Sequence, residues 1–177
     1  VASTTAPGPP PTDPSSPAPR ATETPQDPLS PRPGLESAAP LGQPTCKGPA
    51  LTVTDADAIV TPQYRRAIFV LRTSGAACQL KGYPKVVLRG ADGRALAVTA
   101  RQGGHGLPPE QPAAATLSRT TSLSFAVATA RDGSCVDVTA LDVTLPGTTT
   151  VHRTATDLRV CGSTVGLSPV HRQGDDE

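Results

Sequence analysis

The chain has 177 residues, with 16 Lys and Arg, 15 Asp and Glu, and a formal net charge of +1 at pH 7. Two Tyr and two Phe are its only aromatic residues, so the basic residues are not interleaved with the aromatic side chains that stack on nucleic acid bases. The longest strongly hydrophobic string is AIFVL, far shorter than the roughly 20 residues of a transmembrane helix. These features argue against nucleic acid as a partner and against a helical membrane span within this chain.

Residues 1–45 differ in composition from the rest of the chain. Thirteen of the 21 prolines precede Cys46, whereas all aromatic residues and all cysteines lie from Cys46 onward. A segment so poor in apolar side chains cannot offset the entropy lost on ordering. We therefore predict a disordered Pro-, Ser- and Thr-rich spacer over 1–45, a folded domain over 46–171 and a polar tail over 172–177. Such a spacer favours an anchor upstream of it, so we expect the chain to be membrane-tethered through that anchor.

The domain consists of short runs of alternating apolar residues separated by turn residues, a pattern that predicts strands. We expect strands within 50–60, 64–73, 85–89, 94–101, 116–130, 140–147, 149–160 and 163–170. Ala67, Phe69 and Leu71 alternate along the second of these and share the face expected to be buried. Seven or eight strands without a convincing helix predict an all-β sandwich.

Turn residues predict how some of these strands connect. The sequence GADGR at 90–94 indicates a short hairpin turn that joins 85–89 to 94–101. RDGS at 131–134 indicates a second turn. The irregular segment 102–114 is long for a loop in a compact domain, and loops of that length are often functional.

Four cysteines are present, and none of them forms a Cys-x-x-Cys pair. An even number in a short chain behind a spacer favours two disulfides in an oxidising compartment, and four cysteines allow three pairings. Sequential pairing closes loops of about 30 residues, each stabilising the fold by roughly 3–4 kcal/mol in the chain-entropy model. The alternative is a reactive thiol at Cys78 whose pKa is lowered by Lys81.

Several segments together carry a family likeness. These are CKGPALTV, with which the domain begins at Cys46, CQLKGYP, which begins at Cys78, and the later segments ALDVTLPG and LSPV. With them the chain resembles the actinobacterial family of secreted domains of unknown function numbered 4232. The resemblance implies an immunoglobulin-like sandwich with paired cysteines, exported behind a lipoprotein signal or a membrane anchor, and it implies no reaction. We accordingly expect Cys46 to join Cys78 and Cys135 to join Cys161.

Basic residues are concentrated in one part of the domain. Residues 64–101 hold eight Arg and Lys but only one acidic residue. If their strands are neighbours, Arg66, Arg72, Lys85 and Arg89 form one positive surface, which would attract phospholipid headgroups or a phosphorylated cell-wall polymer. The alternative is a solvated face whose charges discourage edge pairing.

Three other residues suit a binding or metal site. His105 lies between glycines and suits either a ligand contact, a pH-responsive group or a solvated loop residue. Asp55 and Asp57 have a spacing compatible with calcium, but no EF-hand loop follows them. The sequence contains no Gly-x-Ser-x-Gly elbow, P-loop or dinucleotide glycine motif. We assign no catalytic residue, no metal and no cofactor.

The function predicted from these features is non-catalytic binding. We expect an extracytoplasmic module, secreted or anchored at the cell envelope, that binds a protein or an anionic envelope polymer. One alternative is a sensor or accessory domain of a larger membrane receptor. Another is an envelope hydrolase that uses the loop 102–114 and Glu110.

Overall fold

The structure, a computed structural model, describes residues 42–174, so most of the predicted spacer and residues 175–177 of the predicted tail lie outside it. The described residues form nine strands and no helix, and therefore no helix that could span a membrane. The strands are β1 Leu51–Val60, β2 Tyr64–Thr73, β3 Cys78–Leu80, β4 Lys85–Arg89, β5 Thr99–Gln102, β6 Ala115–Leu117, β7 Leu123–Thr144, β8 Val151–Leu167 and β9 His171–Arg172.

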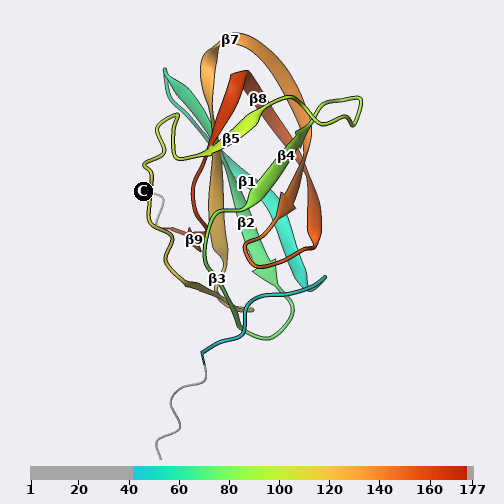
Figure 1. The fold of residues 1–177 in the computed structure, drawn as a ribbon, viewed down its shortest axis with the longest axis vertical. Coiled ribbons are helices and arrows are strands. Elements are labelled where there is room, and N and C mark those ends of the chain that lie inside the picture. Colours follow the sequence, from blue (N-terminus) through green and yellow to red (C-terminus); the bar gives the residue numbers. More distant parts are fainter. Residues whose placement is uncertain (1–41, 175–177) are drawn as a thin grey trace, which may run out of the picture. The chain divides into compact units, whose positions relative to one another are not determined.

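Seven of these strands belong to one sheet, shown in Figure 1. Its strand order is β1-β2-β7-β8-β5, and β4 and β9 also pair with β7. The pairs are antiparallel except for β5 and β8, which run parallel. Strands β3 and β6 form a separate antiparallel pair.

The long hairpin of β7 and β8 runs through both layers of the fold. Residues 123–130 of β7 pair with β2, whereas 140–144 pair with β4. Between these parts the register with β8 shifts from Ala130 to Cys135, and Gly133 has a φ of 94°. Extra residues of this kind bend a strand, and the ribbon of β7 curves over at its labelled end (Figure 1). One continuous sheet thereby supplies both faces of a β-sandwich-like fold.

The core lies between the two layers. Phe69 of β2 and Phe125 of β7 are fully buried and stack with their ring centroids 5.2 Å apart. From the second half of β7, Val138 and Leu141 pack into the same cluster, as does Leu158 of β8. With so few aromatic side chains, most of the buried apolar surface comes from Leu and Val.

The all-β prediction is confirmed, as is the buried face of Ala67, Phe69 and Leu71. The predicted turn at 131–134 does not end a strand, because the chain accommodates it as a bend inside β7. Sequence patterns for a turn and for a bulge share the same Gly and Asp residues, so they did not distinguish the two.

The predicted hairpin at 85–101 is only partly correct. Its turn forms, since Gly90 N–H donates to Arg94 O at 3.1 Å. The returning segment bridges β4 only at Ala95. The N–H of Val98 then donates to Leu96 O at 2.9 Å, and this three-residue turn redirects the chain. Strand β5 consequently pairs with β8 instead of β4.

Both predicted disulfides are present and no cysteine is free. The Cys46–Cys78 bond ties the segment before β1 to β3, where Cys46 N–H also donates to Gln79 O at 3.1 Å. The second bond, Cys135–Cys161, joins directly opposed residues of β7 and β8. The reactive thiol considered for Cys78 is therefore wrong, and two disulfides favour an oxidising, extracytoplasmic environment.

Candidate functional site

The four basic residues predicted to form one surface lie on two strands that are not neighbours. Arg66 and Arg72 belong to β2, and Lys85 and Arg89 belong to β4. Both strands pair with β7, but with different halves of it, on opposite sides of its bend. The condition for a shared positive surface is therefore not met.

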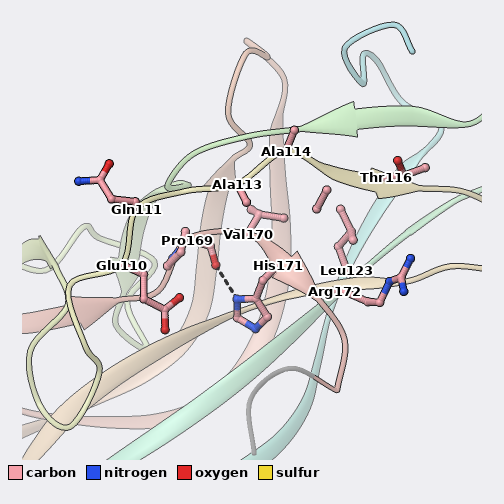
Figure 2. A pocket seen from close by; sticks show the side chains of 11 residues that line it. Glu110, Gln111, Ala113, Ala114, Thr116, Leu123, Pro169, Val170, His171 and Arg172 are labelled. Atoms are coloured by element: carbon pink, nitrogen blue, oxygen red, sulfur yellow. Dashed lines mark hydrogen bonds between the residues drawn. The ribbon is translucent and has the colours of Figure 1, made fainter. Parts of the chain in front are cut away.

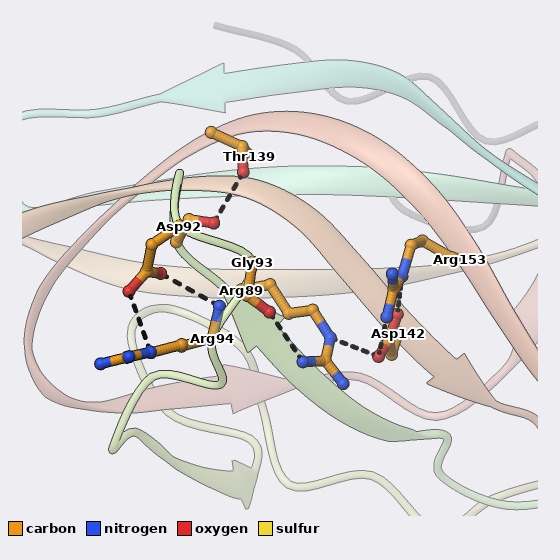
Figure 3. A network of polar contacts seen from close by, with 8 residues as sticks. Arg89, Asp92, Gly93, Arg94, Thr139, Asp142 and Arg153 are labelled. Carbon is orange, nitrogen blue, oxygen red and sulfur yellow. Dashed lines mark hydrogen bonds and ion pairs between the residues drawn. The ribbon is translucent and has the colours of Figure 1, made fainter.

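Arg89 is instead part of an ion-pair network around a buried carboxylate, drawn in Figure 3. Asp142 of β7 is 7% exposed and accepts hydrogen bonds at 2.6 Å from Arg89 Nε and from Arg153 Nε. Arg153 Nη2 donates a further bond of 3.0 Å to the same carboxylate. These bonds, the one from Arg153 foremost, lower the pKa of Asp142 to about 2. The network thus joins β4, β7 and β8 through Asp142, and Arg89 is not a free cation for a ligand.

Replacing Asp142 with Asn should lower the free energy of unfolding by about 2–3 kcal/mol. Loss of one member of a fully buried pair costs about 3–5 kcal/mol, but here the side chains of Arg89 and Arg153 are 27% and 62% exposed. Denaturant titration measures the change. Asp137→Asn is the matched control, because its side chain is 80% exposed and lies 3.8 Å from Arg159; an equal loss in both variants would contradict the role given to Asp142.

The same network predicts a pH dependence. A carboxyl group whose pKa falls on folding stabilises the folded state above its unfolded pKa and loses that contribution as the pH falls through the folded value. For Asp142 these values are 3.8 and about 2. The difference in unfolding free energy between the parent and Asp142→Asn should therefore shrink as the pH falls from about 4 to about 2. A constant difference over this window would refute the assignment.

The loop 102–114 is packed against the sheet. Gly103 N–H donates to Leu167 O at 2.8 Å, and the side chain of Leu107 is buried. Arg66 Nη2 donates to Gly106 O at 3.1 Å. A Cβ atom on Gly106, whose φ is 82°, would overlap the ring of Tyr64. The loop is therefore held against the sheet at Gly103, Gly106 and Leu107.

His105 is half-buried within this loop and has a φ of 50°. Its Nε2 lies 3.3 Å from Thr164 Oγ1 of β8. Glu110, the acidic residue considered for a hydrolase, has an exposed side chain, while its backbone carbonyl accepts a bond of 2.8 Å from Tyr83 Oη. The loop therefore does not bring His105 and Glu110 together through any hydrogen bond of the described residues.

A cavity of about 330 Å³ lies between the segment 110–116 and the segment 169–172, as Figure 2 shows. His171 projects into it and donates from Nδ1 to Pro169 O at 2.9 Å. Its Nε2 lies 3.2 Å from Ser124 Oγ. A serine beside an oriented histidine is the pattern of an activated nucleophile, but Ser124 is completely buried in β7. The Ser124 hydroxyl therefore joins β7 to His171 of β9 in the interior of the protein. In this structure a substrate could not reach it.

Three arginines line a second cavity, of about 360 Å³, at the bend of β7. We name it the arginine pocket and define it by Arg65 of β2, Arg131 of β7, Arg159 of β8 and the Cys135–Cys161 disulfide, with Val60 and Ala130 at its border. The disulfide holds β7 and β8 together at the bend, so it fixes the distance between the strands that carry two of these arginines.

The positive charge of the arginine pocket is only partly compensated. Arg65 Nη2 donates to Asp157 O and Arg131 Nη1 to Thr61 O, each at 2.8 Å. These carbonyl acceptors orient the guanidinium groups but carry no net charge. Among the described residues, Arg159 alone of the three has a carboxylate partner, the exposed Asp137 at 3.8 Å. An exposed pair at this distance contributes little, so the pocket is suited to an anion.

The pair of aspartates considered for calcium is engaged otherwise. Asp55 Oδ2 accepts a hydrogen bond of 2.5 Å from Thr156 Oγ1, and Asp57 Oδ1 accepts one of 2.7 Å from Ala58 N–H. The register of β1 shifts between the two residues, so they do not share one face. Within residues 42–174, no group of three or more His, Cys, Asp and Glu side chains is placed so that it could hold a metal ion.

Sequence reasoning did not select the arginine pocket. Arg65 lies in the basic stretch 64–101, whereas Arg131 falls in the predicted turn 131–134 and Arg159 in the predicted strand 149–160. The available signal was the pairing of Cys135 with Cys161, which places the residues flanking each cysteine side by side. Together with a strand continuing through 131–134, that pairing would have brought Arg131 and Arg159 to the same end of the domain.

The family described as Domain of unknown function (DUF4232) matches residues 46–171. The chain belongs to this family. The DUF4232 match includes both disulfides, the ion-pair network of Asp142 and the arginine pocket. No curated protein and no solved structure matches the chain.

Proposed function

We propose that the protein is a non-catalytic, extracytoplasmic binding module of the cell envelope and that the arginine pocket binds an anionic group of its partner. The observation that carries this proposal is the convergence of Arg65, Arg131 and Arg159 on one cavity, with neutral acceptors for two of them. We further propose that the protein is an exported actinobacterial lipoprotein and that its strands have an immunoglobulin-like arrangement.

The chemistry of the arginine pocket supports an anionic envelope polymer as the partner. Guanidinium groups present several N–H donors in a plane and bind carboxylate or phosphate oxygens by two bonds at once. Arg131 and Arg159 are exposed, so a repeating polymer can approach both without entering a closed site. The nearby disulfide supports a place outside the cytoplasm.

Charge reversal tests the proposal. Calorimetric titration with short-chain polyphosphate should give an affinity that falls as salt rises, because binding releases counterions. The double variant Arg131→Glu/Arg159→Glu should bind at least about tenfold more weakly, since two charge-assisted hydrogen bonds are lost.

The control is Arg72→Glu/Lys81→Glu, which makes the same change in net charge at two other exposed positions. It should retain affinity within about twofold. An equal loss of affinity in both double variants would show that only the net charge matters. If the parent protein did not bind polyphosphate either, the proposal would be refuted.

A further inference from the structure

The two sides of the sandwich are closed differently. On one side β1 lies against β8, and Thr156 Oγ1 of β8 donates a hydrogen bond to Asp55 of β1. Close by, Arg65 Nη2 of β2 donates to Asp157 O of β8. On the other side β4 and β5 border a cavity of about 410 Å³. Figure 1 shows these two strands near each other on one side of the fold. We call this cavity the β4–β5 groove.

Each border of the β4–β5 groove is the edge of a strand. Strand β4 forms its ladder with β7 and strand β5 forms its ladder with β8, each on one side. The outer edge of β4 is covered at one end, where Leu96 N–H donates to Leu88 O. Backbone groups alternate in direction along an antiparallel strand, so Val86 also directs its N–H and C=O away from β7. Val86 lines the groove, so a strand added there would meet these groups.

The side chains of the β4–β5 groove form an apolar floor with a basic border. Leu167 is buried and Val86 is half-buried, while Lys85 and Arg101 are exposed. The other lining residues are Tyr83, Pro84, Ala100 and Gln102. Within the part of the chain that the structure describes, no acidic residue lines the groove.

We propose that the β4–β5 groove binds an extended, acidic peptide segment of a partner protein, which adds a strand along one of the two edges. Main-chain hydrogen bonds supply affinity in this mode of recognition, and alternate side chains supply specificity. Apolar side chains of the segment would lie over Val86 and Leu167, and the carboxylates between them would face Lys85 and Arg101. The same two cations disfavour a second copy of this chain at the edge, because each copy would bring like charges together.

A synthetic peptide tests the proposal on the full chain. The probe is an eight-residue peptide of alternating Val and Glu with blocked termini, added to the 15N-labelled protein. Amide shift changes should concentrate at Lys85–Val87 and Thr99–Gln102, and hydrogen exchange at Val86 should slow. The same peptide with every backbone nitrogen methylated should not bind, because neither of its edges then has the donors that strand addition requires.

Charge variants complete the design. Lys85→Glu/Arg101→Glu should weaken binding of the Val-Glu peptide by at least about tenfold and favour a Val-Lys peptide, because the sign of the charge pairing is reversed. Arg72→Glu/Lys81→Glu should bind like the parent. Undiminished binding of the N-methylated peptide would overturn strand addition. A dimer of the free protein that protects the same amides, those of Lys85–Val87 and Thr99–Gln102, would also overturn the proposal. The groove is separate from the arginine pocket, so Arg131→Glu/Arg159→Glu should leave peptide binding unchanged.

Discussion

Replacing Cys46 and Cys78 together with Ala is expected to lower the free energy of unfolding by about 3–4 kcal/mol, the stabilisation that the chain-entropy model gives for a loop of this length. The two residues are 32 positions apart. Without the bond the unfolded chain regains the freedom of that loop. The folded state still holds the segment before β1 by backbone hydrogen bonds, among them those from Cys46 N–H to Gln79 O and from Gln79 N–H to Pro44 O.

Urea titration of the parent and the Cys46→Ala/Cys78→Ala variant measures this loss. The single variant Cys46→Ala is the wrong comparison, because it leaves an unpaired thiol at Cys78. Reduction of the parent provides the independent check, since it opens both disulfides and should cost more than the double variant alone. A double variant within about 1 kcal/mol of the parent would contradict the chain-entropy account.

Replacing Phe125 with Ala should be the most damaging single change in the core, at about 3–5 kcal/mol. Phe125 is completely buried and packs against Phe69 with an angle of 17° between the rings. Phe69 and Phe125 are the only phenylalanines of the chain, and the side chains around the cavity would be mostly Leu and Val. The stacked pair loses its specific contact in addition to the buried area.

Val136→Ala is the control for this prediction. Val136 lies in the same strand, β7, but is 46% exposed, so its truncation should change the unfolding free energy by no more than about 0.5 kcal/mol. Thermal and denaturant unfolding of both variants provide the measurement. If Phe125→Ala cost as little as Val136→Ala, the stacked pair would not be the centre of the core.

The sequence predicts this fold where a single strand carries its own pattern. Ala67, Phe69 and Leu71 alternate on one face, and that face is buried. Prediction from the sequence fails where the pairing of a strand depends on a partner that is distant in the chain. Residues 94–101 have the composition of a strand that would pair with β4. Their later part, β5, instead pairs with β8, because strand pairing depends on segments that are far apart in the chain.

The candidate site was harder to predict for the same reason. A local count of charges selected Arg66 and Arg89, but the first contacts Gly106 O and the second neutralises Asp142. Arg131 and Arg159 are separated in the sequence and meet only because β7 and β8 bend together. Charge density along the chain therefore says little about which cations remain available to a ligand.

The bend of β7 and β8 has a consequence for how the domain opens. In a sandwich of two separate sheets, one sheet can loosen while the other keeps its hydrogen bonds. Here the same hairpin carries a ladder in each layer, so neither layer can be released without disturbing the other. Amide protons in the middle of both halves of β7 should then exchange only through global unfolding, with one common free energy.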